Sequence, residues 1–267
     1  MSYERHRDPG GFFAAMKARC DARDFDFIDG IVHGPEELVL CLGRFVARAP
    51  YTSDYRWLDI FYKSTRERAV DYLRTRDYFF RYDTECHWLT RTVPGLEKRL
   101  VRLLAGKFVL GSTNLIRWSK RLGPALALVK RRPDVVVDLF IPYRRILDFY
   151  AWYAMEPRYY PLWVIPYRVP RPYPWLSDDM VRRMDDPLLI DCAIYGMPNG
   201  DPARDWSQVF EEQTYAHGGV KTLISRNHYT RERFDAIYHQ ANYAEAKRRL
   251  DPHGVFPGLY EKLCRVG

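Results

Sequence analysis

Paired cysteines and long apolar runs are both missing from this sequence of 267 residues. The five cysteines are odd in number and never form a CxxC pair, so neither a disulfide framework nor a zinc site is predicted. No stretch approaches the roughly 20 apolar residues that cross a bilayer, and the N-terminal MSYERHRDPGG lacks the apolar core of a signal peptide. We therefore expect a reduced, cytoplasmic protein that binds no metal and has no membrane-spanning segment.

Glycine-rich phosphate-binding motifs are missing as well. The sequence contains no GxGxxG, GxxxxGK[ST], GxSxG or HExxH pattern, and its 16 glycines are scattered along the chain. These absences give no support to nucleotide-binding, serine-hydrolase or zincin functions. No segment is predicted to wrap a pyrophosphate with backbone amides.

Basic charge and aromatic side chains are abundant. The net charge is +8, and 15% of the residues are aromatic, including 20 tyrosines. A basic, aromatic protein could bind RNA by base stacking, but the aromatics lie inside apolar runs such as FYAWYAM and YYPLWVIPY. That placement favours core packing and an apolar ligand cavity. We therefore expect no nucleic acid partner.

The first half of the chain reads as a hairpin followed by helices. Residues 24–47 predict a β-hairpin, and residues 58–63 a short strand that leads into a helix over 64–76 with Ser64 as its N-cap. Residues 96–132 predict two or three basic amphipathic helices. Their basic face either lies in solvent or contacts a membrane surface peripherally.

The second half alternates strands and helices. Its pattern predicts strands at 134–142, within 156–175, at 187–195 and at 221–225, and helices at 143–155, 206–217, 231–250 and near the C-terminus. The second strand is expected at a sheet edge because of its prolines, the third at the centre, and Thr230 is expected to cap the long helix. The connections are too few for a large parallel sheet. We therefore predict the α+β class, with an antiparallel or mixed sheet and helices packed on one face.

A dense cluster of polar and aromatic residues occupies positions 76–92, RDYFFRYDTECHWLTRT. Facing a cleft, these side chains could bind or protonate a substrate, because Tyr and His are common general acids. The structural alternative is a half-buried aromatic strand that contains an ion pair between Arg81 and Asp83. The residues with this potential are Tyr78, Arg81, Tyr82, Asp83, His87 and Trp88.

A second cluster, TLISRNHYT, occupies positions 222–230. Arg226, Asn227 and His228 stand where a strand is expected to end and a capped helix to begin. Side chains and amide donors can converge there on an anion or an electron-rich ring. The alternative is a polar loop closed by local hydrogen bonds.

The ending FDAIYHQANYAEAKRRLDPHGVFPGLYEKL resembles that of flavin oxidoreductases of the vanillyl-alcohol oxidase type. Further segments extend the likeness, and in this order and spacing they are similar to the delta(24)-sterol reductase family over nearly the whole chain. These segments are DFIDGIVHGPEELVLCLGRF, YKSTRERAVDYLRTRDYFFRYDTECHWLTRT, VVVDLFIPYRRILDF, YYPLWVIPYRV and DCAIYG.

The resemblance implies that FAD binding and the covering of the substrate belong to different regions of the protein. In that family an N-terminal domain binds FAD, and the region similar to this chain forms a cap over the isoalloxazine ring. Residues 1–267 would then be one substrate or cap domain without the FAD-binding domain, which is lost or supplied by a separate chain, and the chain would be inactive alone. The implied reaction reduces a carbon–carbon double bond of a sterol-like lipid, with NADPH as a candidate electron donor. Alternatives are a cap of the lipid-linked sugar oxidase type and a non-enzymatic lipid-binding or interaction module.

The resemblance also implies roles for single residues. Ser225, Arg226 and Asn227 would contact FAD, with Arg226 as the cation at the edge of the ring. Tyr82, His87 and His228 would be catalytic. The residues expected to line the substrate are Tyr78, Arg81, Lys63 and Tyr195.

Overall fold

The computed structural model describes residues 1–83, 95–114, 117–118, 121, 132–171 and 173–264. The chain folds as two compact units. Unit 1 comprises Met1–Asp134, Arg158–Val164 and Ile194–Gly200, and unit 2 comprises Val135–Pro157, Ile165–Ala193 and Asp201–Gly267. His87 and Trp88 lie outside the described residues.

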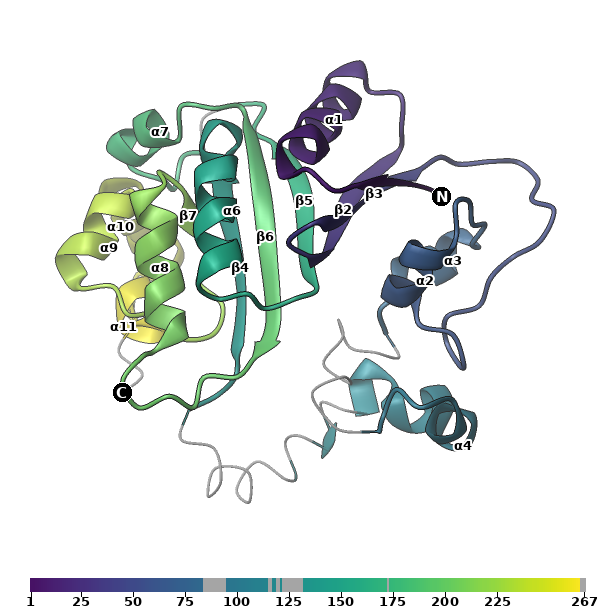
Figure 1. The fold of residues 1–267 in the computed structure, drawn as a ribbon. Helices are drawn as coiled ribbons and strands as arrows, with labels where there is room; N and C mark the ends of the chain where they lie inside the picture. Colours follow the sequence, from purple (N-terminus) through teal and green to yellow (C-terminus); the bar gives the residue numbers. More distant parts are fainter. Residues whose placement is uncertain (84–94, 115–116, 119–120, 122–131, 172, 265–267) are drawn as a thin grey trace. The chain divides into compact units, whose positions relative to one another are not determined.

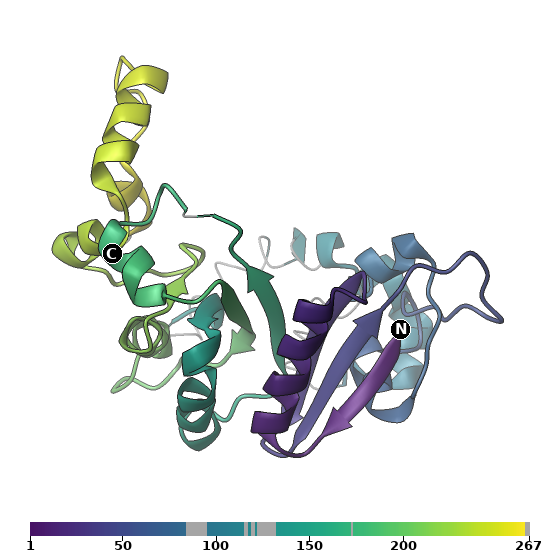
Figure 2. The ribbon, with the colours of Figure 1, turned by 90° about the horizontal axis from the view of Figure 1, so that it is seen from above.

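Unit 1 is built on three antiparallel strands, β1 (Ser2–His6), β2 (Phe27–Gly34) and β3 (Glu37–Gly43). The predicted hairpin is confirmed by the pairing of β2 with β3. Helix α1 (Pro9–Ala22) lies over these strands (Figure 2) and buries Phe12, Phe13 and Met16. A Cβ atom at Gly30 would come within 2.5 Å of the Phe12 ring, so glycine allows this close approach.

The other face of the unit 1 strands is covered by residues that follow the hairpin. Ile31, Val39 and Cys41 pack there with Phe61 and Tyr82 in one buried cluster. The first two helices that follow the hairpin in the chain are α2 (Phe61–Glu67) and α3 (Thr75–Phe79).

The expected strand at 58–63 and the single helix over 64–76 are wrong. Helix α2 begins at Phe61, so Ser64 lies inside it and its hydroxyl donates to the Phe61 carbonyl at 2.8 Å. The helix stops because the next residues pair with β1, where the Tyr3 amide donates to the Ala69 carbonyl at 3.0 Å. An extended neighbour strand therefore outweighs local helix propensity here.

One of the basic helices expected over 96–132 is α4 (Arg99–Leu110). Its Arg102 is 1% exposed and donates to the carbonyls of Leu58 and Asp59, each at 3.2 Å, so this basic residue does not lie on a solvated face. Residues 122–131 lie outside the described part of the chain.

Unit 2 holds β4 (Val135–Pro142), α6 (Ile146–Met155), α7 (Asp178–Met184), α8 (Trp206–Ala216), β7 (Val220–Lys221) and the larger part of β6 (Leu188–Met197). A 3-10 turn over Tyr143–Arg145 leads into α6. In β4 the odd positions are buried and the even positions up to Phe140 are half-buried. Helices α6 and α8 cover the same face of the unit 2 strands (Figure 1). The predicted strands at 134–142 and 187–195 and the helices at 143–155 and 206–217 are confirmed, whereas the strand expected at 221–225 is only the two residues of β7.

The C-terminal helix expected over 231–250 is divided into α9 (Arg231–Ile237) and α10 (Gln240–Leu250), followed by α11 (Leu259–Leu263). Thr230 caps α9 as predicted, accepting from the Arg233 amide at 3.1 Å. The break falls at Tyr238, which forms an antiparallel bridge with Leu176. The adjacent His239 amide donates to the Trp175 carbonyl at 2.9 Å, so backbone pairing again interrupts a predicted helix.

The seven strands follow the order β1-β3-β2-β5-β6-β4-β7, with antiparallel pairing between β2 and β5 and between β4 and β7. The predicted α+β class is confirmed. The edge position expected for β5 (Leu162–Arg168) is wrong, because β5 lies between β2 and β6. Its prolines are accommodated because Pro161 precedes, and Pro166 follows, the three residues that pair with β2.

Candidate functional site

The first candidate site is the Arg81 cluster of unit 1, formed by Asp29, Tyr78, Arg81, Tyr82 and Trp163. Arg81 and Asp29 are 8% and 5% exposed and form an ion pair at 2.7 Å. The Trp163 indole N–H donates to the same carboxylate oxygen at 3.1 Å, and Arg81 donates to the Tyr78 carbonyl at 3.0 Å. The ion pair expected between Arg81 and Asp83 is wrong, because Asp83 accepts from the Ser112 side chain instead.

Aromatic rings surround the Arg81 guanidinium. Its central carbon lies 4.1 Å from the ring centre of Tyr78, 4.7 Å from that of Tyr82 and 5.8 Å from that of Trp163. Delocalised guanidinium charge suits such stacking better than a lysine ammonium would. The cluster therefore combines a buried ion pair with a rigid apolar wall.

Electrostatics in this cluster favour the charged form of Arg81 and the neutral form of Tyr78. Burial disfavours the Arg81 charge, but the surrounding groups, with the Asp29 carboxylate among them, outweigh burial and raise the pKa of Arg81. Burial, followed by the nearby Asp29 charge, raises the pKa of Tyr78. Tyr78 therefore keeps its proton at neutral pH.

The other residues predicted on the substrate side are placed differently. Tyr195 packs partly buried against the same core as Tyr82, and its carbonyl accepts from the Tyr159 hydroxyl at 3.0 Å. Lys63 is half-buried, with 44% of its side chain exposed, and pairs with Glu97 at 2.5 Å. The structure thus brings Tyr78, Arg81 and Tyr82 together, with Tyr195 against their core, and leaves Lys63 in a separate ion pair.

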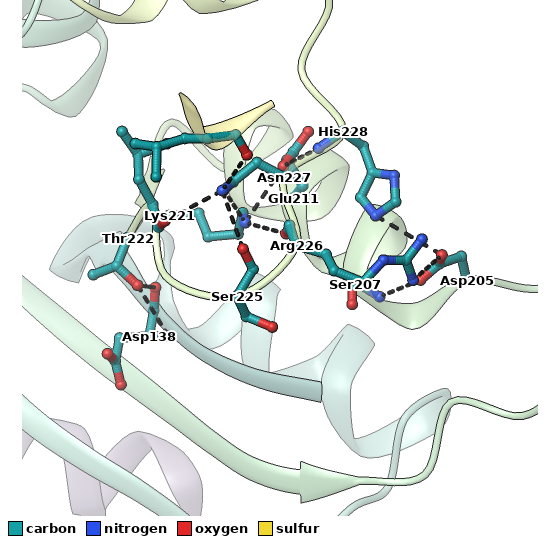
Figure 3. A network of polar contacts seen from close by, with 12 residues as sticks. Asp138, Asp205, Ser207, Glu211, Lys221, Thr222, Ser225, Arg226, Asn227 and His228 are labelled. Carbon is teal, nitrogen blue, oxygen red and sulfur yellow. Dashed lines mark hydrogen bonds and ion pairs between the residues drawn. The ribbon is translucent and has the colours of Figure 1, made fainter. Parts of the chain in front are cut away.

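The second candidate site is the Asn227 network of unit 2, formed by Glu211, Lys221, Arg226, Asn227 and His228 (Figure 3). The Lys221 ammonium donates to the Asn227 side-chain oxygen at 2.6 Å and to the Arg226 carbonyl at 3.0 Å. It also lies 3.4 Å from the Glu211 carboxylate, which accepts from the His228 amide at 3.1 Å. Burial raises the pKa of Glu211 and lowers that of Lys221, each opposed by the charge of the other.

Asn227 ties its own loop together. Its amide group donates to the carbonyls of Leu223, Ser225 and Leu263 at 3.2, 3.4 and 3.2 Å. The side chain is 8% exposed and all its donors and acceptors are engaged within the chain. The observed role of Asn227 is therefore structural, and its predicted contact with FAD stays a prediction.

Arg226 and His228 both face the carboxylate of Asp205. Arg226 pairs with it at 2.6 Å, and His228 Nε2 lies 3.8 Å away, as Figure 3 shows. Asp205 also caps α8 by accepting from the Ser207 amide at 3.0 Å. Ser225 is exposed, with a left-handed φ of 60°. Within this loop the Ser225 hydroxyl and the 35% exposed Arg226 side chain are the groups best able to contact a cofactor, and both assignments stay predictions.

Sequence reasoning missed the carboxylates that organise these sites. Asp29 and Asp191 each interrupt an apolar strand, in FIDGIV and LLIDCA, and a charged residue in such a run is a recognisable signal. Asp191, on β6, is 3% exposed, and burial and the neighbouring Asp138 raise its pKa to about 8. Glu211 and Lys221 carry no comparable signal, because they meet only in the folded chain.

The described residues contain no group of three or more His, Cys, Asp or Glu side chains placed to hold a metal ion. None of the helices described is both long enough and apolar enough to cross a membrane.

Comparison with known proteins shows what the chain is similar to. No family model matches the chain. It is 22% identical over 254 residues to the Delta(24)-sterol reductase of Homo sapiens, and the matched region covers 90% of this chain and 48% of that protein. It is 22% identical over 267 residues to the Delta(24)-sterol reductase of Arabidopsis thaliana, covering 89% and 47%. A Delta(24)-sterol reductase homolog of Caenorhabditis elegans is 20% identical over 264 residues. The predicted resemblance is confirmed: the chain is a distant relative of the Delta(24)-sterol reductases and spans about half of their length.

Proposed function

We propose that this chain forms the substrate-side part of an FAD-dependent oxidoreductase that reduces a carbon–carbon double bond in a sterol-like lipid. The proposal is carried by similarity to Delta(24)-sterol reductases over 90% of the chain. Because the chain spans only 48% of that relative, the activity requires a flavin-binding domain joined to it or supplied by another chain. FAD, once bound and reduced by a nicotinamide such as NADPH, would supply hydride to one alkene carbon, and a protein group would supply a proton to the other.

The Arg81 cluster is the part of unit 1 that we assign to the substrate side. Its indole and phenol rings form the kind of apolar wall that a sterol-like ligand needs. The ion pair between Arg81 and Asp29 holds Tyr78, Tyr82 and Trp163 in fixed positions. Tyr82, and His87 beyond the described residues, stay proposed catalytic residues that contact the substrate. A peripheral membrane contact would give access to such a lipid.

The Arg226 side chain is the group of unit 2 that we assign to the cofactor. A flavin needs a cation or hydrogen-bond donor beside its pyrimidine edge. Arg226 keeps a partly exposed guanidinium oriented by Asp205, which suits that role. His228 stands beside the same carboxylate and is proposed to act with it.

The test combines sterol binding with turnover. The purified chain is titrated with a delta(24)-sterol, and binding is followed by tryptophan fluorescence, because Trp163 lies in the Arg81 cluster. The chain is then mixed with FAD, NADPH, the sterol and a separately expressed flavin domain of a sterol reductase. Mass spectrometry is expected to detect a product that has gained two hydrogens, only when the flavin domain is present.

Two variants and two further outcomes make the result decisive. Tyr82→Phe is expected to reduce turnover while sterol still binds, whereas Arg66→Ala, at an exposed ion pair with Glu37, is expected to change neither. Binding without turnover would replace the proposal by a lipid-binding module. A chain that binds FAD stoichiometrically by itself would contradict the need for a separate flavin domain.

A further inference from the structure

Asp191 and Asp138 lie on neighbouring strands of unit 2, β6 and β4. In β4 the odd positions are covered by α6 and α8, whereas Asp138 is an even, half-buried position on the opposite face. Phe140, two residues after Asp138, packs against the buried cluster that contains Leu189 of β6. Asp191 follows Leu189 by two residues on the same strand, so it lies on that same opposite face. This carboxyl pair takes no part in either site described above.

The surroundings of Asp191 stabilise its protonated form. The residue is 3% exposed, and no cation of the described chain is among the groups that act on it. The Leu139 amide donates to the carboxyl group, while Oδ1 forms no hydrogen bond with any described residue. Burial, followed by Asp138, raises the pKa of Asp191 to about 8. Asp191 therefore carries a proton at neutral pH.

Aromatic rings flank the carboxyl pair. The rings of Tyr167 on β5 and Phe140 on β4 lie 5.2 Å apart in an edge-to-face arrangement, and β6 runs between their strands. Tyr167 is 46% exposed, and Asp191 and Asp138 both raise its pKa after burial. The titratable groups around Asp191 are thus Asp138 from β4, Tyr167 from β5 and the buried Cys192 beside it on β6.

Backbone pairing fixes the position of Asp138. The Thr222 amide donates to its carbonyl at 3.0 Å, and the Thr222 hydroxyl donates to the same oxygen at 3.3 Å. Figure 3 shows the Asp138 carboxylate turned away from Thr222 and from the Asn227 network. The Asp138 carboxyl group is therefore not a member of the Asn227 network.

We propose that Asp191, with Asp138 beside it and the exposed ring of Tyr167 in front, is a proton-donating site for an apolar ligand bound against β4, β5 and β6. The assignment rests on the proposed function, which requires a proton source. Hydride forms the new C–H bond at one alkene carbon, and the π electrons of the double bond take the Asp191 proton at the other. Asp191 is left as a carboxylate and regains its proton from water.

Chemistry favours this carboxyl group over the buried phenols. A general acid works best when its pKa lies near the working pH. Tyr78 has its pKa raised by burial and holds its proton too tightly. A carboxyl pair that shares one proton is a recurrent solution to this requirement.

Infrared titration of the purified chain tests the protonation without any turnover. The wild type is expected to show a protonated carboxyl band that disappears as pH rises through about 8. Asp191→Asn should remove the band, and Asp178→Asn, at an exposed position of α7, should leave it unchanged. Adding the delta(24)-sterol should shift the band frequency in the wild type.

The pH profile of sterol reduction, measured with the flavin domain present, tests the role in the reaction. The wild-type rate is expected to fall above pH about 8, as Asp191 loses its proton. Asp191→Asn should lower the rate by about 100-fold or more and abolish the fall in rate at high pH. Asp138→Asn removes the neighbouring negative charge and should move this fall in rate to lower pH, which tests the site even if Asp191→Asn folds poorly.

Specific outcomes overturn the proposal. A band that persists in Asp191→Asn, or that does not respond to the sterol, would show that Asp191 is not the group in question. If the rate falls at the same high pH in both Asp variants as in the wild type, Asp191 is likewise not the proton donor. If the wild type does not reduce the sterol at all, the proposed function fails, while the ligand-induced band shift still decides whether Asp191 faces a ligand.

Discussion

Two buried aspartates in this chain have opposite partners. Asp29 in unit 1 is 5% exposed and faces the Arg81 guanidinium, whereas Asp191 in unit 2 is 3% exposed and faces a second carboxyl group. Both interrupt apolar strands of similar composition. A buried carboxyl group requires either a counter-ion or a proton, and Asp29 and Asp191 illustrate the two cases.

The difference shows that burial alone does not define a functional group. The Arg81 pair satisfies its charges internally and gains rigid geometry from the aromatic rings around it. Such a pair positions its neighbours but has no proton ready to give. Asp191, beside Asp138, keeps a proton that can leave near neutral pH, which suits a role in proton transfer more than a purely structural role.

The largest expected effect of a substitution at one fixed pH comes from removing the counter-ion of Asp29. Arg81→Met leaves a buried carboxylate without its partner and should lower the free energy of unfolding by about 3–5 kcal/mol. Urea denaturation of the purified chain measures this loss. The double variant Arg81→Met with Asp29→Asn should recover part of it, because no unpaired charge remains.

An exposed ion pair provides the matched control. Arg66 and Glu37 pair at 2.6 Å with side chains 50% and 45% exposed. Arg66→Ala should cost less than about 1 kcal/mol, since solvent screens this pair. Equal losses from Arg66→Ala and Arg81→Met would contradict the assigned role of burial.

The second effect is the pH dependence of stability caused by Asp191. Its pKa rises from the ordinary 3.8 to about 8 on folding, so the folded state binds the extra proton and loses stability as pH increases. Between these values the wild type should lose about 1.4 kcal/mol per pH unit from this group. Asp191→Asn should lack that slope, as measured by urea denaturation at several pH values.

Asp178→Asn serves as the control for this slope, because Asp178 is exposed at the start of α7. It should keep the wild-type pH dependence. Parallel curves for the wild type and Asp191→Asn would show that Asp191 titrates normally in the folded chain.

The smallest expected effect concerns a third carboxylate, Asp205, whose side chain is 9% exposed and pairs with the 35% exposed side chain of Arg226. Asp205→Ala removes the N-cap of α8 and should cost about 1 kcal/mol in unfolding free energy. Thr230→Ala removes the comparable N-cap of α9 without an ion pair. An equal loss in both variants would show that the contact with Arg226 adds no stability.

Local patterns identified much of the fold. The hairpin of β2 and β3, strands β4 and β6, helices α6 and α8 and the Thr230 cap are each encoded within a few residues by periodicity and capping. The polar clusters at 76–92 and 222–230 were also visible as clusters. Their internal partners were not, because Asp29 lies 52 residues from Arg81 along the chain.

The failures share one cause. The helix expected over 64–76 stops where residues 69–71 pair with β1, and the helix expected over 231–250 breaks where Tyr238 pairs with Leu176. The strand β5 lies inside the sheet because its neighbours pair around its prolines. In each case a backbone partner distant in sequence outweighs a local preference.

The sequence by itself determined the α+β class, the main strands and helices and the kinship with sterol reductases, because these depend on local periodicity and on the order of motifs. The tertiary structure alone decided which buried carboxyl group meets a cation and which keeps a proton. That outcome depends on the neighbours that folding brings within a few ångströms, since electrostatic interactions in a low-dielectric interior are set by distance and burial. Identical residue types in similar apolar strands thereby acquire opposite chemistry.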